Sequence, residues 1–154
     1  VASELGVTIE AQVFGRISLA LSARCYHARA HSRTKDSCLF VCENDPDGLV
    51  LSTLDHKPFL VANGVQTLSY EYLNLAQEIP ALISAGVSRY RLSPHSCDMV
   101  RVATIFRGVL DGTLSMEAAL AHLQEIPLDA PFSNGFHHGQ PGYGWTTPAS
   151  AATH

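Results

Sequence analysis

Residues 70–92 read YEYLNLAQEIPALISAGVSRYRL, and this stretch decides the expected fold. Apolar side chains recur over 70–85 with the spacing of an amphipathic helix. Pro80 indicates a kink or a second helix start, and Gly86 suits the helix end. Residues 87–92 then alternate apolar and polar side chains, as a strand does. Because a strand linked to a helix favours a parallel sheet, the sequence predicts the α/β class.

Further strands are predicted on the N-terminal side of this stretch. Apolar residues at every second position predict a strand over 7–13, which Gly15 ends. Two short strands are predicted over 49–54 and 59–62, joined by a turn at 55–58. We therefore expect a β-hairpin to be inserted between the helical parts of the chain.

Helices are predicted mainly in the C-terminal part of the chain. Apolar periodicity predicts them over 96–110 and 115–126, with Ser96 and Ser115 as N-caps. Residues 17–22 predict only a helical turn. The order of elements is that of βα units, but these strands are too few to close a barrel.

Composition excludes some functional classes. Charged residues make up 16% of the 154 residues, below the usual share of about 25%, so we expect part of the surface to be buried against another surface. A net charge of −4 argues against a nucleic-acid partner, which needs a basic face. No apolar run reaches the roughly 18 residues of a transmembrane segment, and no signal peptide is visible, so we expect a cytoplasmic protein.

Three of the four cysteines lie in one polar, basic segment over residues 25–42, CYHARAHSRTKDSCLFVC, which predicts a loop. Cys25, Cys38 and Cys42 have the spacing C-x12-C-x3-C, and thiolates bind soft metal ions and iron–sulfur clusters. Nearby cations favour the thiolate form and offset the negative charge of a ligated cluster. These cations are Arg24, Arg29, Arg33 and Lys35.

Zinc is the main alternative to an iron–sulfur cluster. His27, His31 and His95 offer nitrogen ligands for a structural zinc site, although short CxxC pairs are absent. The spacing predicts a metal site but does not separate zinc from iron–sulfur. Cys97, which stands apart from the other three, is expected to be a small buried apolar residue.

The cysteine segment also carries a family resemblance. LSARCYHARAHSRTKDSCLFVC (residues 21–42) resembles the cysteine motif of the UbiV-like family of oxygen-independent ubiquinone-biosynthesis proteins, within the collagenase-like peptidase superfamily. The likeness continues through VANGVQTLSYEYLNL (61–75), RLSPHSCDM (91–99) and FRGVLDG (106–112) to NGFHHGQPG (134–142). The C-x12-C-x3-C spacing is its specific part.

This resemblance implies a 4Fe-4S cluster held by Cys25, Cys38 and Cys42, with a fourth ligand outside this chain. It also implies a TIM-barrel-like fold, of which residues 1–145 form the C-terminal half and 146–154 a disordered tail. Val1 in place of Met agrees with an N-terminal part that precedes this chain. The implied partners are a UbiU-like protein in a heterodimer and a ubiquinone precursor or other small molecule.

Polar side chains beside the predicted strands suggest a cleft. Arg91, His95 and Asp98 cluster where the strand at 87–92 meets the next helix, and the ends of parallel strands carry functional groups in α/β proteins. The alternative explanation is a capped turn with a surface histidine. Asn63 and Gln66 follow the strand at 59–62 and are predicted to line the same cleft, with turn hydrogen bonding as the alternative.

The sequence therefore supports three functional hypotheses. The first is an iron–sulfur protein that assists oxygen-independent hydroxylation in ubiquinone biosynthesis. The second is a collagenase-like peptidase in which the cysteines are structural, and the third is a zinc-stabilised domain without enzymatic activity. The chain has no G-x-S-x-G or H-E-x-x-H motif, and three clustered cysteines suit metal ligation better than a single activated thiol.

Overall fold

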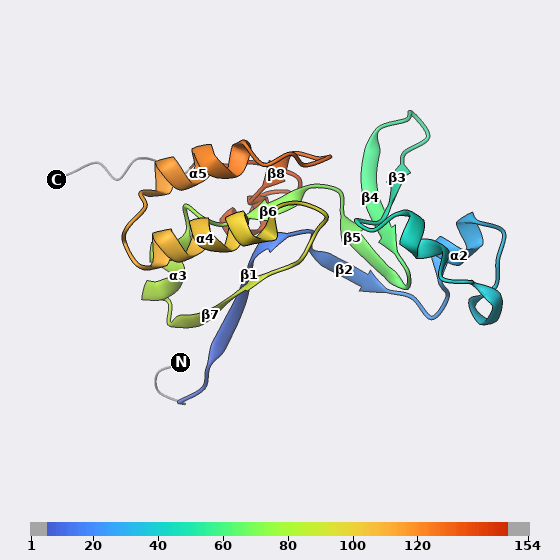
Figure 1. The fold of residues 1–154 in the computed structure, drawn as a ribbon, viewed down its shortest axis with the longest axis horizontal. Helices are drawn as coiled ribbons and strands as arrows, with labels where there is room; N and C mark the ends of the chain where they lie inside the picture. The colour runs from blue at the N-terminus through green and yellow to red at the C-terminus, as the bar shows by residue number, and fades with distance from the viewer. Residues whose placement is uncertain (1–5, 148–154) are drawn as a thin grey trace. The chain divides into compact units, whose positions relative to one another are not determined.

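The structure is a computed structural model that describes residues 6–147 (Figure 1). The chain divides into two compact units. One unit comprises Arg16–Tyr72, and the other comprises Val1–Gly15 with Leu73–His154. Most of the expected tail, residues 148–154, lies outside the described part. Among residues 6–147, none of the helices has both the length and the apolar character that crossing a bilayer requires.

The discontinuous unit is built on a mixed sheet with the strand order β7-β1-β6-β8. Its strands β1 and β7 pair in parallel, whereas β1 and β6 are antiparallel, with Phe14 opposite Asn74. The strands are β1 (Ile9–Gly15), β6 (Tyr72–Asn74), β7 (Val87–Leu92) and β8 (Phe132–Ser133). The predicted strands at 7–13 and 87–92 are thus confirmed, and the expected parallel sheet is found in part, because β1 also pairs antiparallel with β6.

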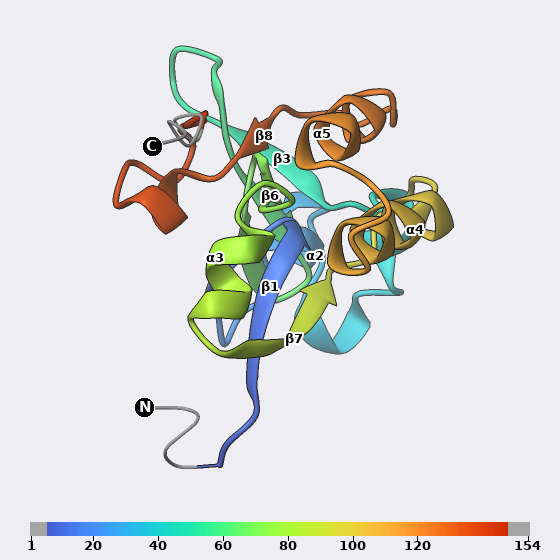
Figure 2. The same cartoon turned by 90° about the vertical axis from the view of Figure 1, so that its left-hand side faces the viewer.

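Three helices accompany this sheet: α3 (Ile79–Ser84), α4 (Met99–Leu110) and α5 (Met116–Gln124). Figure 2 shows α3 on one side of β1, with α4 and α5 side by side on the other. Ser115 caps α5 as predicted, since its hydroxyl accepts a hydrogen bond from the Ala118 amide at 3.2 Å.

The core of this unit lies between β1 and the helices. Phe14 is fully buried and makes edge-to-face contacts with Phe106 at 6.1 Å and Phe132 at 6.3 Å between ring centroids. Val102 and Phe106 of α4 are buried at a spacing of one helical turn. The apolar periodicity of the sequence therefore predicts which face of α4 packs into the core of this unit.

The unit Arg16–Tyr72 contains an antiparallel sheet with the order β2-β5-β4-β3. The predicted hairpin is its β3–β4 pair, and Val50 lies opposite Val61 in it. A short helix, α2 (Tyr26–Ala30), and two single 3-10 turns occupy the cysteine segment that was expected to be a loop. The strands are β2 (Ser18–Leu21), β3 (Leu49–Ser52), β4 (Pro58–Asn63) and β5 (Gln66–Ser69), and the 3-10 turns are Lys35–Ser37 and Val41–Asn44.

Several local predictions are wrong, each for a physical reason. Residues 70–85 do not form one helix: β6 comes first, because its backbone pairs with β1 and all three of its side chains are buried. Residues 17–22 contain β2 rather than a helical turn, and β2 is an edge strand whose exposed residues carry no alternation. Asp98, not Ser96, caps α4, since its carboxylate accepts from the Arg101 amide at 2.9 Å.

The α/β class is confirmed in the form of a mixed α/β structure, with two sheets and four helices in the described part. The hairpin belongs to the second sheet. The TIM-barrel half remains a prediction.

Candidate metal centre

The three cysteines of the motif all lie in the unit Arg16–Tyr72. Cys25 is the N-cap of α2, and its sulfur accepts a hydrogen bond from the Ala28 amide at 3.4 Å. Cys38 ends the first 3-10 turn, and its sulfur accepts from the Phe40 amide at 3.5 Å. Cys42 lies inside the second 3-10 turn. All three are free and half-buried, so their sulfurs are available as ligands.

The backbone between Cys38 and Cys42 is unusual. Leu39 and Phe40 have φ values of 49° and 52°, a left-handed conformation that is uncommon for bulky residues. Their side chains are 71% and 70% exposed, so core packing does not account for the conformation. Strained backbone of this kind gathers at functional sites. Here it shapes the turn that carries two of the three sulfurs.

Positive charge surrounds the first cysteine. A hollow of about 300 Å³ beside Cys25 is lined by the cationic residues Arg24, Arg29, Arg33 and Lys35, together with Ala23 and Thr34. All four cationic residues are exposed. They offset the negative charge that thiolates bring to a metal centre.

Beside the cysteines, the structure assembles a second set of possible ligands: His27, His31 and Asp45. Their ligand atoms lie within 4.8 Å of one another, the arrangement required to hold one ion. The sequence analysis named both histidines but not Asp45, which lies in the stretch NDPDG (44–48) just after the cysteine segment. His95, the third nitrogen ligand expected for zinc, belongs to the other unit.

The residues present fit a 4Fe-4S cluster by their chemistry. Iron–sulfur clusters are held mainly by cysteine thiolates, and Cys25, Cys38 and Cys42 are all free. Two of these sulfurs already accept backbone amide hydrogen bonds, the kind of contact that tunes clusters.

The predicted cleft residues are divided between the two units. Arg91 extends over β1, with its guanidinium 3.7 Å from the Glu10 carboxylate and 3.5 Å from the Gln12 amide oxygen. Asp98 is engaged in capping α4. Asn63 and Gln66 face each other across the β4–β5 turn in the other unit. The shared cleft remains a prediction.

His95 and Cys97 lie in the loop between β7 and α4. A side chain at Gly15 would approach His95 Nε2 to 2.8 Å, so the absence of a side chain there makes room for the loop. The sulfur of Cys97 lies 3.6 Å from that of Met99. Cys97 belongs to a different unit from the other three cysteines.

One buried polar network was not predicted from the sequence. The Glu78 carboxylate is buried, and its Oε1 accepts hydrogen bonds from Asn134 Nδ2 at 2.8 Å and from His138 Nε2 at 2.9 Å. Asn134 also bonds to both the amide and the carbonyl of Thr146 at 2.7 Å. Some 56 residues separate Glu78 from Asn134, so no local pattern signals the contact.

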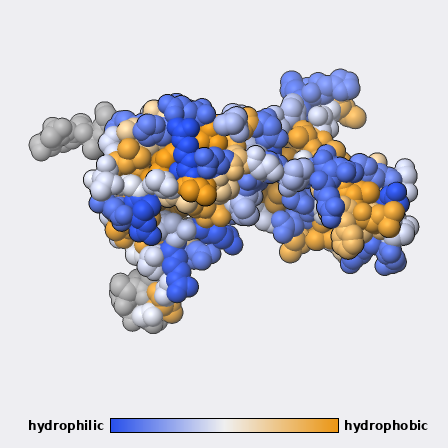
Figure 3. Space-filling model, in the orientation of Figure 1, coloured by the Kyte–Doolittle hydropathy of each residue, from blue (hydrophilic) through white to orange (hydrophobic). Residues whose placement is uncertain are grey.

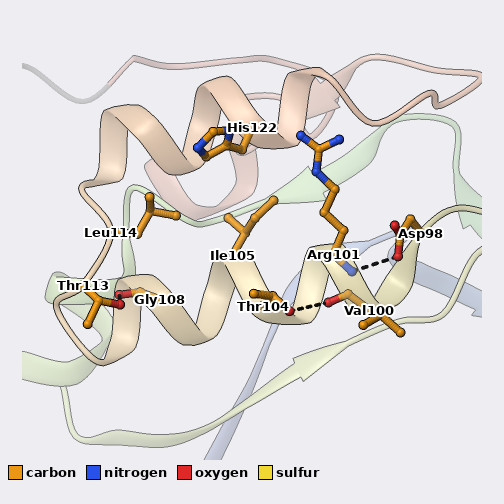
Figure 4. Close-up of a pocket in the computed structure, with 9 residues that line it drawn as sticks. All are labelled: Asp98, Val100, Arg101, Thr104, Ile105, Gly108, Thr113, Leu114 and His122. Atoms are coloured by element: carbon orange, nitrogen blue, oxygen red, sulfur yellow. Dashed lines mark hydrogen bonds between the residues drawn. The ribbon is translucent and has the colours of Figure 1, made fainter.

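A surface pocket of about 600 Å³ lies between α4 and α5 (Figure 4). Arg101 extends from α4 toward α5 and pairs with Glu125, while His122 comes from α5. Figure 3 shows hydrophobic residues over this region, where Val100 is largely exposed. The side chains that line this pocket do not form a set of metal ligands within the described part of the chain.

Comparison with known proteins identifies the family. The chain matches the description "Peptidase family U32" over residues 1–147. The chain therefore belongs to peptidase family U32, the collagenase-like peptidase family, and the predicted resemblance is confirmed at this level. No solved structure matches the chain.

Proposed function

We propose that this U32 protein binds a 4Fe-4S cluster through Cys25, Cys38 and Cys42, with a fourth ligand outside this chain. One observation carries the proposal: three free, half-buried cysteines lie in one short basic segment. Residues that serve only as core need neither the left-handed turn between Cys38 and Cys42 nor the cations that line the hollow beside Cys25.

Each residue of the segment has a defined task in this proposal. The cluster supplies one-electron transfer when bound. Cys25 links it to the start of α2, while Cys38 and Cys42 hold it across the left-handed turn. The amide groups of Ala28 and Phe40 donate to the sulfurs and stabilise their negative charge.

The resemblance to the UbiV-like family supports the proposal that this chemistry serves oxygen-independent hydroxylation during ubiquinone biosynthesis. We propose that the protein acts in the cytoplasm as a heterodimer with a UbiU-like partner, on a ubiquinone precursor or another small molecule. We also propose that the mixed α/β chain forms half of a TIM-barrel-like domain. The low charged share of 16% agrees with a surface covered by another chain or segment.

A ligand scan tests the cysteine assignment. Cys25→Ser, Cys38→Ser and Cys42→Ser are purified without oxygen, and iron and acid-labile sulfide are measured. Each variant is expected to lose most of its iron, because serine replaces a thiolate ligand with a hydroxyl. Cys97→Ser is the matched control and should keep its iron. Full iron in the three variants, or its loss in the control, would contradict the assignment.

Family membership supports a second function, peptide-bond cleavage by a collagenase-like peptidase. Its test is hydrolysis of gelatin or collagen peptides by the protein and by a variant without the three cysteines. Cleavage that survives their loss favours this function with structural cysteines. Stoichiometric zinc bound to sulfur, without iron, favours the zinc-stabilised domain instead.

A further inference from the structure

His27, His31 and Asp45 converge on one point beside the cysteine segment. His27 is in α2 and His31 follows that helix one turn later, so their rings stack with centroids 5.5 Å apart. Both Nε2 atoms point to the same carboxylate oxygen of Asp45: the distance is 2.8 Å from His27 and 3.7 Å from His31.

The contacts of the His27 ring indicate which of its nitrogens carries a hydrogen. The side chain is fully buried, and its Nδ1 lies 3.3 Å from the Ala62 carbonyl oxygen. Because a carbonyl oxygen only accepts, Nδ1 must carry the hydrogen. In the neutral ring Nε2 then presents a lone pair to a carboxylate oxygen at 2.8 Å. Two acceptors at that distance require a cation or an extra proton between them.

The distances suit a single ion. Zinc bonds to nitrogen and oxygen of about 2.0–2.1 Å in a tetrahedral arrangement place two ligand atoms about 3.3 Å apart. The observed separations of 2.8 Å and 3.7 Å lie on either side of that value. Histidine ligands of metal ions also commonly donate their other ring N–H to a backbone carbonyl, as Nδ1 does here to Ala62.

We propose that His27 Nε2, His31 Nε2 and Asp45 Oδ2 form a site for one divalent transition-metal ion, Zn²⁺ in the first instance. The site uses no cysteine and is separate from the proposed cluster. The side chains of His31 and Asp45 are 35% and 28% exposed, so the ion has an open side toward solvent for water or a further ligand.

The ion would also position the segment that carries the cysteines. His27 belongs to the helix that Cys25 caps, and the Asp45 amide donates to the Cys42 carbonyl at 3.2 Å. A metal ion joined to both residues links the two ends of the cysteine segment, and Ala62 anchors the ring to β4. The site therefore holds in place the backbone on either side of the sulfurs.

The test compares zinc binding by the wild-type protein with that of His31→Gln and Asp45→Asn. The side chains of His31 and Asp45 are partly exposed, so these two variants should fold, and the fully buried His27 is left unchanged. The exposed His122→Gln is the matched control. We expect one Zn²⁺ per wild-type and control chain, and affinity lowered by more than about tenfold in the two variants.

X-ray absorption at the zinc edge provides a second readout. Zinc in this site has only nitrogen and oxygen neighbours, whereas zinc held by the cysteines has sulfur. Sulfur neighbours, equal zinc affinity in the two variants, or no saturable zinc binding would each overturn the proposal. Loss of iron in the cysteine variants bears only on the cluster, so the two proposals can fail separately.

Discussion

Asn134 is the residue on which the buried Glu78 network depends, and replacing it with alanine should destabilise the protein strongly. The fully buried side chain of Asn134 donates to the Glu78 carboxylate and to the Thr146 carbonyl, and it accepts from the Thr146 amide. Asn134→Ala removes all three hydrogen bonds and leaves the carboxylate with His138 as the donor to that oxygen.

The size of the loss follows from these contacts. A hydrogen bond to a charged group contributes about 1.5–3 kcal/mol and a neutral one about 0.5–1.5 kcal/mol. One charged and two neutral bonds give roughly 2.5–6 kcal/mol for Asn134→Ala. Domains are stable by only about 5–15 kcal/mol, so the variant should lie close to unfolding. At about 3 °C per kcal/mol, the melting temperature should fall by roughly 8–18 °C.

Urea denaturation followed by circular dichroism measures the free energy of unfolding. The exposed Gln140→Ala is the control and should change it by less than about 0.5 kcal/mol. In a Glu78→Gln background the same Asn134→Ala change should cost less, by at least about 0.5 kcal/mol, because the acceptor is neutral. If Asn134→Ala matches the control, the network contributes nothing and this reasoning is refuted.

Two further substitutions probe the loop between β7 and α4 and its contacts. Asp98→Ala should cost about 1 kcal/mol in the free energy of unfolding because it removes the α4 cap, and Asp98→Asn should recover most of that loss. Full stability of Asp98→Ala would contradict the cap. Gly15→Ala should cost more than Gly112→Ala: both glycines have positive φ, but only at Gly15 would the new Cβ lie 2.7 Å from Ser93 Cβ. Equal melting temperatures for these two variants would show that the close approach is not restrictive.

Local signals predicted those parts of the fold that local physics determines. Apolar and polar residues alternate in the sequences of β1 and β7. Ser115 precedes a segment whose apolar residues recur with helical spacing. Gly86, with φ of 86°, follows Ala85, the C-cap of α3, and so lies at the end of this helix as expected. These features depend on neighbours within one or two turns, so one sequence suffices to find them.

Long-range pairing accounts for what was missed. The apolar run in β6 fits a helix as well as a buried strand, and only its pairing with β1 decides between them. In the candidate metal centre, the spacing of the three cysteines can be read from the sequence. The contact between Asp45 and His27 cannot, because it depends on how a turn 18 residues further along the chain folds back onto α2. Glu78 and His138 are likewise joined only by the tertiary fold.

Iron and acid-labile sulfide analysis of the wild-type protein, purified without oxygen, is the decisive measurement. With the fourth ligand supplied from outside this chain, we predict about four iron and four sulfide per chain and a broad brown absorption band. The band should fade on reduction with dithionite. Zinc without iron, or protein without metal under these conditions, would contradict the cluster assignment and leave the peptidase and zinc-stabilised functions as the alternatives.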